Sequence, residues 1–330
     1  MTQWHDAQVL VTGGGGFIGS HLVESLVSRG ARVRAFVHYN SRGDAGLLRL
    51  VPREVLDQVE IISGDIRDPQ AVQSAVKGCK FVFHLGALIS IPYSYVHPTE
   101  VAQTNLMGTL NVLNACRELG TERLVHTSTS EVYGTALQVP INESHPLQGQ
   151  SPYSASKIGA DKLAESYYCA FALPVVTVRP FNTFGPRQSA RAVIPTIITQ
   201  VLVQDAIHLG NLESRRDFTF VSDTVNGFIK AAEASGVEGK VYNLGSGSEV
   251  TIGELTHRVM RITGRLLPIV TDEIRLRPEA SEVQRLLSDN SKARAELGWA
   301  PEYSLEQGLE QTINWTRQHL DLYRVGRYEF

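Results

Sequence analysis

The sequence contains few cysteines, no excess of positive charge and no long apolar run. Its three cysteines are scattered over 330 residues without a CxxC pair or histidines at ligand spacing. This pattern predicts buried thiols in a reducing cytoplasm, and neither a disulfide framework nor a metal site. Lysine and arginine total 31 against 34 acidic residues, so the chain lacks the bulk positive charge that holds a nucleic acid. No apolar run approaches the ~20 residues that cross a bilayer.

A targeting segment is also missing from the sequence pattern. Residues 1–7 are polar, and the apolar run 8–11 ends directly in glycines, without the basic and long apolar regions of a signal peptide. The hydrophobic share of 42% and the charged share of 20% are ordinary for a folded chain and exclude a disordered one. We therefore expect a globular cytoplasmic protein with no membrane partner and no nucleic-acid partner.

The first half of the chain alternates short β-branched runs with helical stretches. The runs are almost entirely apolar, as strands covered on both faces must be. They span residues 9–12, 33–37, 59–62, 81–84, 124–127 and 175–178. Helical stretches between them include residues 18–29, 69–76 and 105–119. This regular alternation predicts an α/β fold built on a doubly wound parallel sheet of the Rossmann type.

The pattern changes after residue 180, where loops become longer and richer in proline, arginine and asparagine. We predict a first domain over residues 1–180 that is re-entered near 215–250, with residues 241–244 rejoining the sheet. A smaller, mostly helical domain then comprises residues 181–214 and 251–330. The boundary is therefore not a single cut.

A glycine-rich loop follows the first apolar run and opens the first helix. The spacing of Gly13, Gly16 and Gly19 allows a tight turn, a close approach of backbone to a pyrophosphate, and close packing of helix on strand. The first helical turn, with Phe17 and Ile18, adds free N–H groups and a positive dipole end for the phosphates. In this strand–turn–helix setting we interpret the first domain as dinucleotide-binding, in preference to an ordinary glycine turn.

The end of the second strand leaves the choice of dinucleotide open. An acidic residue there would accept the ribose 2′-OH of NAD, but residues 37–42 contain none. Asn40 could hydrogen-bond a 2′-OH, whereas Arg42 could meet the 2′-phosphate of NADP or simply be a solvated loop residue. We expect NAD, with NADP as the alternative. Further cofactor contacts are expected after the third and fourth strands, from Asp65, Ile66, Leu85 and Ala87.

The strongest chemical signal is a tyrosine and a lysine at i and i+4. Ser151 can cap a helix and Pro152 suits its first turn, so Tyr153 and Lys157 would share one helix face. A phenol with a pKa near ~10 is a poor base at neutral pH, and we expect the neighbouring ammonium to lower it. The pair could then deprotonate an alcohol as hydride leaves it. The alternative is a half-buried tyrosine beside a solvated lysine.

These motifs together resemble the extended short-chain dehydrogenase/reductases, a family of nucleotide-sugar epimerases, dehydratases and decarboxylases. The resemblance covers essentially the whole chain and includes residues 13–19, Tyr153 with Lys157, and residues 179–186. It is closer still to the 4,6-dehydratases of bacterial legionaminic-acid pathways. Those enzymes act on a nucleotide-linked N-acetylglucosamine, usually the UDP sugar, with GDP as the carrier for some relatives. The segments typical of them are residues 126–134, 146–153 and 186–191.

The resemblance implies a role for Glu131. In such dehydratases hydride leaves sugar C4, a carboxylate removes the C5 proton, water leaves from C6, and the hydride returns to C6. Glu131 would be that base, and Thr129 would hydrogen-bond the sugar near Tyr153. Related dehydratases carry an aspartate before this glutamate as the proton donor to the leaving hydroxyl. Here Ser130 takes that place, so we expect Glu131 to act as base and then acid, or a bound water to assist.

Substrate contacts and assembly are also implied by the resemblance. Arg216 and Arg277 are expected at the diphosphate, where guanidinium groups bind phosphate oxygens bidentately. Asn182 would contact the phosphate or the acetamido region, and Arg191 is a substrate, rim or interface residue. A homodimer is implied, with helices over residues 105–119 and 153–171 forming the interface. An apolar stripe on the second helix could equally be intramolecular core; it consists of Ile158, Leu163, Tyr167 and Phe171.

Three other functions remain open at this point. A UDP-glucuronate decarboxylase also resembles Thr129-Ser130-Glu131 and passes through a 4-keto intermediate, but it loses CO₂. A C4 epimerase needs Tyr153 and Lys157 and has no use for Glu131. A non-catalytic dinucleotide-binding module on the same fold could dispense with the tyrosine and lysine. We favour the dehydratase over the decarboxylase because residues 153–157 read Tyr-Ser-Ala-Ser-Lys, which fits the dehydratases better. Glu131 disfavours the epimerase, and the presence of both Tyr153 and Lys157 disfavours a binding module.

Overall fold

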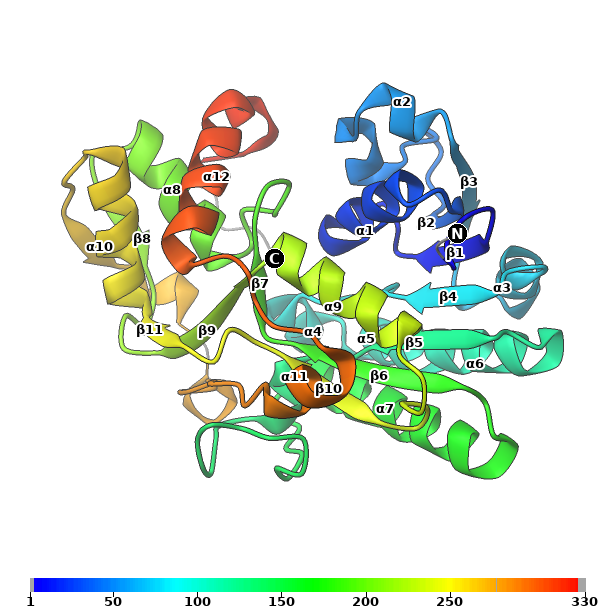
Figure 1. Cartoon of the computed structure of the whole chain (residues 1–330). Helices are drawn as coiled ribbons and strands as arrows, with labels where there is room; N and C mark the ends of the chain where they lie inside the picture. Colours follow the sequence, from blue (N-terminus) through cyan, green and yellow to red (C-terminus); the bar gives the residue numbers. More distant parts are fainter. Residues whose placement is uncertain (1–2, 277, 326–330) are drawn as a thin grey trace.

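A seven-stranded sheet, in which every neighbouring pair of strands is parallel, forms the larger part of the molecule (Figure 1). The computed structural model describes residues 3–276 and 278–325. In spatial order the strands are β10 (Val241–Leu244), β6 (Val175–Pro180), β5 (Arg123–Thr127), β4 (Phe81–His84), β1 (Gln8–Thr12), β2 (Arg32–His38) and β3 (Val59–Gly64). The predicted Rossmann-type α/β fold is confirmed, and the segment near residue 241 rejoins the sheet beside β6.

Helices cover both faces of this sheet. The helices of one face are α3 (Pro69–Val76), α6 (Gly108–Leu119) and α7 (Pro152–Phe171), and those of the other are α1 (Phe17–Ser28) and α9 (Val221–Glu233). Successive side chains of a strand point to opposite faces. Leu10 of β1 therefore packs in the core beneath α3, α6 and α7, while Val9 and Val11 pack in the core beneath α1 and α9. Burial on both faces explains why the strands lack polar alternation.

The strand order reverses between β1 and β4, which is where a doubly wound sheet opens a crevice for ligands at its carboxyl edge. The chain runs outward from β1 through β2 to β3 and then returns to β4 on the other side of β1. The loops after β1 and β4 consequently meet, and the Gly86 amide donates a hydrogen bond to Thr12 Oγ1 at 3.0 Å.

Residues after β6 build a second, smaller part beside the carboxyl edge (Figure 1). Its strands are β7 (Asn182–Phe184), β9 (Arg215–Phe220) and β11 (Glu249–Thr251) in one sheet, and β8 (Ile207–Leu209) and β12 (Ile269–Thr271) in another. Its main helices are α8 (Val193–Val203), α10 (Ile252–Thr263) and α12 (Leu305–Gln318). β9 pairs with β7 and β11, so the chain returns to the central sheet only with α9 and β10.

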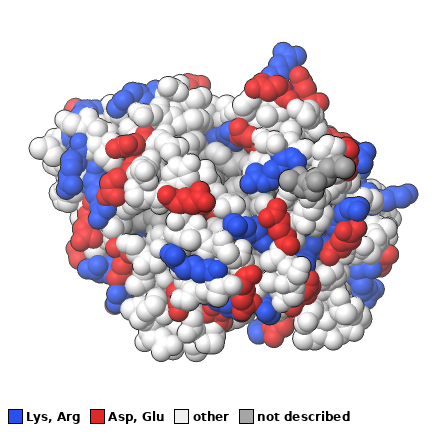
Figure 2. Space-filling view, in the orientation of Figure 1, with Lys and Arg blue, Asp and Glu red and all other residues white. Residues whose placement is uncertain are grey.

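Short helices complete the connections. They are η1 (Gly46–Leu50), α2 (Arg53–Leu56), α4 (Ile91–Val96), α5 (Pro98–Ala102), η2 (Gln103–Met107), η3 (Ser130–Tyr133), η4 (Glu273–Arg275), η5 (Glu279–Ser281), α11 (Ser291–Leu297) and η6 (Leu320–Leu322). Of the helices described, none is both long and apolar enough to cross a membrane. Within residues 3–276 and 278–325, no three His, Cys, Asp or Glu side chains are grouped as metal ligands. Positive and negative side chains are interspersed over the face shown in Figure 2.

Candidate active site

In the glycine loop after β1, backbone segments lie so close together that there is no room for side chains at Gly13 and Gly19. Gly13 has φ 69°, and a Cβ there would lie 2.9 Å from the Gly86 amide nitrogen. A Cβ at Gly19 would lie 2.1 Å from the Gly13 carbonyl oxygen. The Gly16 amide donates to that same carbonyl at 2.9 Å. The loop therefore leaves its backbone accessible at the start of α1, as a pyrophosphate-binding turn requires.

The loop after β2 folds over the glycine loop. The Asn40 side chain accepts hydrogen bonds from the amides of Arg42 and Asp44 and donates one to the Asp44 carbonyl at 2.7 Å. The Leu47 amide donates to the Gly15 carbonyl at 2.8 Å. Asn40 thus shapes its own turn, and Arg42 is exposed. Their contacts with a ribose remain predictions.

The other predicted cofactor residues lie along the same edge of the sheet. Asp65 binds Arg67 through both carboxylate oxygens, and this ion pair holds the pKa of Asp65 below its usual value. Ile66 is buried against α6, where a Cβ at Gly108 would meet its Cδ1 at 2.7 Å. Leu85 and Ala87 are half-buried directly after β4. Phe17 and Ile18 are also half-buried, in the first turn of α1.

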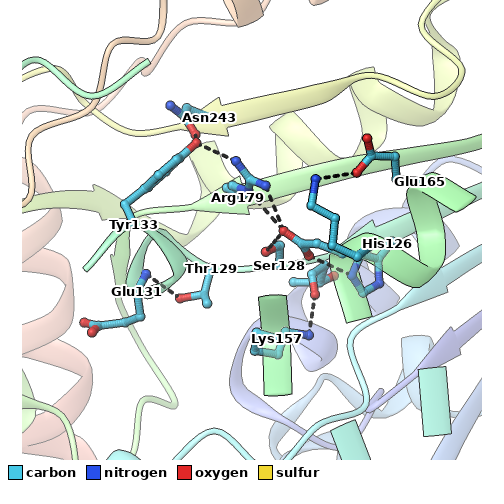
Figure 3. Close-up of polar contacts among 12 residues, drawn as sticks. His126, Ser128, Thr129, Glu131, Tyr133, Lys157, Glu165, Arg179 and Asn243 are labelled. Carbon is cyan, nitrogen blue, oxygen red and sulfur yellow. Dashed lines mark hydrogen bonds and ion pairs between the residues drawn. The ribbon is translucent and has the colours of Figure 1, made fainter. Parts of the chain in front are cut away.

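The tyrosine–lysine pair lies on α7, which begins as predicted. Ser151 caps the helix by accepting a hydrogen bond from the Ser154 amide at 3.1 Å, and Pro152 occupies the first turn. Tyr153 is 6% exposed and Lys157 is 4% exposed. The Lys157 ammonium donates to the Thr127 carbonyl at the end of β5 at 2.7 Å (Figure 3).

Burial controls the protonation of both groups. It raises the pKa of Tyr153 well above its ordinary value; a hydrogen bond with Thr129 lowers that pKa, and the nearby Glu131 carboxylate raises it further. Burial lowers the pKa of Lys157 to about 8, while the Asp161 carboxylate raises it. The sequence-based expectation of a lowered tyrosine pKa is therefore wrong for this structure. The reason is that desolvation of the phenol outweighs its favourable neighbours, and the ammonium is directed at a carbonyl.

The segment after β5 brings a carboxylate to the same region. Thr129 caps η3 by accepting a hydrogen bond from the Glu131 amide at 3.2 Å. Ser130 is 3% exposed, whereas the Glu131 carboxylate lies at the wall of a large cavity. Figure 3 shows Glu131 pointing away from the polar cluster around Lys157. Thr129 and the Glu131 carboxylate both shift the pKa of Tyr153, so this segment acts on the phenol.

The cavity joins Glu131 to the second part of the molecule. It measures about 670 Å³, and its walls include the predicted substrate residues Asn182, Arg191 and Arg216. Asn182 Oδ1 is buried and has no hydrogen-bond partner among the described residues. Arg216 is 7% exposed and lies 3.3 Å from the Glu282 carboxylate. Arg277 lies outside the described residues. Further walls come from residues without a signal in the sequence: Ser214, Arg275, Glu279 and Gln284.

Sequence reasoning missed two groups that organise this site. Asn105, in the π-helical turn η2, accepts from the Leu88 amide and donates to the Leu88 carbonyl and to Ser156 Oγ at 2.9 Å. It joins the loop after β4 to α7. Asp161 and Arg179 form a buried ion pair at 2.9 Å behind Lys157. An aspartate one helical turn after the lysine, on a face that must be buried, was the available signal.

Comparison with known proteins gives consistent matches over almost the whole chain. The family model described as GDP-mannose 4,6 dehydratase matches residues 10–312. A dTDP-glucose 4,6-dehydratase of Actinoplanes sp. is 34% identical, over 94% of this chain and 98% of that protein. A UDP-glucose 4-epimerase of Mycolicibacterium smegmatis is 31% identical, over 94% of this chain and 98% of that protein.

Solved structures show the same two kinds of relative. A dTDP-glucose 4,6-dehydratase from Streptomyces venezuelae, determined with NAD and TYD bound, superposes with a TM-score of 0.86 at 29% identity, covering 96% of this chain and 99% of that one. A UDP-glucose 4-epimerase from Thermotoga maritima, determined with UDP-glucose, gives a TM-score of 0.85 at 29% identity and covers 95% of this chain and 99% of that one.

Proposed function

The chain belongs to the GDP-mannose 4,6-dehydratase family of extended short-chain dehydrogenase/reductases, and from this membership we propose that it is an NAD-dependent nucleotide-sugar 4,6-dehydratase. The glycine cradle supports a bound dinucleotide, because added Cβ atoms at Gly13 and Gly19 would meet backbone. Gly16, Asn40 and Asp65 are further candidates to hold it. The structures of relatives solved with NAD support this cofactor over NADP.

The proposed reaction divides its proton transfers between two residues. Bound NAD supplies the redox chemistry, by accepting the C4 hydride of the sugar and later returning it to C6. Tyr153 acts as the phenolate, which the Lys157 ammonium stabilises; it accepts the C4 hydroxyl proton and becomes a neutral phenol. Glu131 removes the C5 proton, which the new C4 ketone makes acidic. The C6 hydroxyl leaves as water with the proton that Glu131 took from C5. As the hydride returns to C6, C5 takes up one proton, equivalent to the one that Tyr153 accepted from the C4 hydroxyl. The substrate therefore loses one H₂O, and the cofactor ends as it began.

One observation supports a dehydratase most directly: Glu131 faces the cavity that also contains Asn182, Arg191 and Arg216. A C4 epimerase would have no function for a carboxylate at that wall. Ser130 is nearly fully buried and does not line the cavity, so we assign both proton transfers of the elimination to Glu131. Arg191, Arg216 and Arg277 are our candidates for the diphosphate.

The sugar we propose is a nucleotide-linked N-acetylglucosamine. The resemblance to legionaminic-acid-pathway dehydratases in residues 126–134 supports it, with UDP as the expected carrier and GDP as the alternative. The test is incubation of the protein with UDP-, GDP- and dTDP-linked hexoses and with UDP-glucuronate, followed by mass spectrometry. A product lighter by one water than UDP- or GDP-N-acetylglucosamine supports the proposal. An unchanged mass with inverted C4 would indicate an epimerase, and loss of CO₂ from UDP-glucuronate a decarboxylase.

Assembly and location complete the proposal. We propose a homodimer through α6 and α7; Met107, directly before α6, and Phe171, at the end of α7, are 46% and 50% exposed. Leu163 and Tyr167, by contrast, pack in the protein's own core, so only part of the predicted stripe is available. Light scattering that gives the mass of one chain would contradict the dimer. The three free thiols agree with a cytoplasmic location.

A further inference from the structure

One carboxylate behind the tyrosine–lysine pair collects four hydrogen bonds. Asp161 lies on α7 one helical turn after Lys157 and is 5% exposed. Its Oδ1 accepts from His126 Nε2 at 3.1 Å. Its Oδ2 accepts from Ser128 Oγ at 2.8 Å and from Arg179 Nε and Nη2 at 3.1 and 2.9 Å. A buried carboxylate with this many donors is held firmly in place as an anion.

These partners surround the acceptor of the catalytic lysine. His126 and Ser128 are the two neighbours of Thr127 in β5, and the Thr127 carbonyl accepts the Lys157 ammonium at 2.7 Å. Figure 3 shows His126, Ser128 and Arg179 converging on one side of Lys157. Because Asp161 binds the residues on both sides of Thr127, the position of that carbonyl depends on the Asp161 carboxylate.

The charges of this cluster also depend on Asp161. Lys157 and Arg179 are buried cations, and Asp161 is the buried anion between them. Burial lowers the pKa of both His84 and His126, so these rings are neutral. Among the described residues, the titratable groups that interact electrostatically with Lys157 are His84 on β4, His126 on β5 and Asp161 on α7. Arg179 on β6 pairs with Asp161, and Glu131 and Asp161 act on Tyr153.

We propose that Asp161 is a positioning residue for the reaction: its carboxylate fixes the Thr127 carbonyl and keeps Lys157 in the ammonium form next to Tyr153. The consequence for turnover rests on the proposed function, whereas the state of Lys157 is measurable without any sugar. Removal of the anion takes away the attraction that raises the pKa of the buried lysine, which favours loss of the lysine proton.

The chain is suited to a direct measurement because it has only seven lysines. Lysine labelled with ¹³C at Cε gives seven NMR signals, and Lys157→Met identifies the one that belongs to the active site. In the native protein its titration midpoint is expected at about 8. In Asp161→Asn we expect a midpoint at least about one pH unit lower. Glu165→Gln is the matched control: it removes a carboxylate from the same helix, but an exposed one paired with Lys162, and its midpoint stays at the native value.

A folded Asp161→Asn protein with the native midpoint would overturn the proposal. If that variant does not fold, Arg179→Gln provides the opposite test. It removes the cation paired with Asp161, so the midpoint must rise, and an unchanged or lower midpoint contradicts the idea. In a turnover assay, kcat should fall at alkaline pH as Lys157 loses its proton, so the pH of this fall should shift together with the NMR midpoint. The Asp161→Asn variant should therefore recover part of its kcat at pH 6. A native protein that turns over no nucleotide sugar refutes the proposed function alone, because the NMR titration still decides the role of Asp161.

Discussion

Replacement of Lys157 by methionine should abolish turnover and at the same time stabilise the protein at neutral pH. Burial lowers the pKa of this lysine from 10.5 to about 8. At about 1.36 kcal/mol per pKa unit, the buried ammonium costs about 3.4 kcal/mol at pH 7. Lys157→Met removes this cost but leaves the Thr127 carbonyl without its donor at 2.7 Å, a loss of about 1–3 kcal/mol. The net expectation is a gain of about 0.4–2.4 kcal/mol in the free energy of unfolding.

The pH dependence separates this explanation from a general packing effect. The pKa of Lys157 is lower in the folded state than in the unfolded state, so the unfolded chain binds more protons between about pH 8 and 10.5. Stability therefore rises with pH across that window. From pH 7 to pH 9 the native protein should regain about 1.3 kcal/mol that the variant cannot regain. Urea unfolding of both proteins at the two pH values measures this, because titrations common to both cancel. An equal difference in stability at pH 7 and pH 9 would refute the reasoning.

The remaining predictions concern the chemistry and the nucleotide cradle. Tyr153→Phe should lower kcat by about 10²–10⁴-fold and leave the dinucleotide bound; a fall of less than tenfold, measured by mass spectrometry of the product, would exclude this phenol as the acid/base group. Glu131→Gln should lower the rate of water loss by a similar factor while C4 oxidation continues, so reduced cofactor should accumulate on addition of substrate and absorb at 340 nm. Ser130→Ala changes the buried neighbour and should lower kcat less than tenfold. Gly19→Ala should weaken dinucleotide binding at least about tenfold, or 1.4 kcal/mol, because its Cβ would lie 2.1 Å from the Gly13 carbonyl oxygen. Gly253→Ala, whose Cβ meets nothing closer than 3.7 Å, is the control in calorimetric titration with NAD.

The strands of the central sheet could be predicted from sequence because burial on both faces leaves an unbroken apolar run. This held for β1 and β6, and even for β10, which rejoins the sheet about 60 residues after β6 ends. The tyrosine–lysine pair was likewise predictable, since i and i+4 on a helix is a local relation. The region after Pro180 was harder to predict, because its small sheets join segments such as β7 and β9 that are distant in the chain.

The candidate site was only partly predictable for a related reason. Glu131 and Arg216 come from different parts of the chain, and it was the family resemblance that brought them together at one cavity. The aspartate one helical turn after Lys157 was a local signal, but the sequence does not show that Asp161 pairs with Arg179, because that pair joins a helix to a strand end. The direction of the Tyr153 pKa was wrong because a sequence shows a neighbouring charge but not the degree of desolvation.

The charges of the buried cluster suggest why the protein retains a buried lysine that lowers its stability. The three buried charged side chains Lys157, Arg179 and Asp161 carry a net charge of +1 while Tyr153 is a neutral phenol; the Glu131 carboxylate, at the cavity wall, is not one of the three. When the phenol loses its proton to become the base that starts the proposed reaction, its negative charge brings the sum of these four groups to zero. The site is therefore best balanced in the charge state that catalysis forms, as expected for preorganised electrostatic stabilisation. Variants that relieve the buried charge, Lys157→Met first among them, consequently gain stability by removing the field that the phenolate needs.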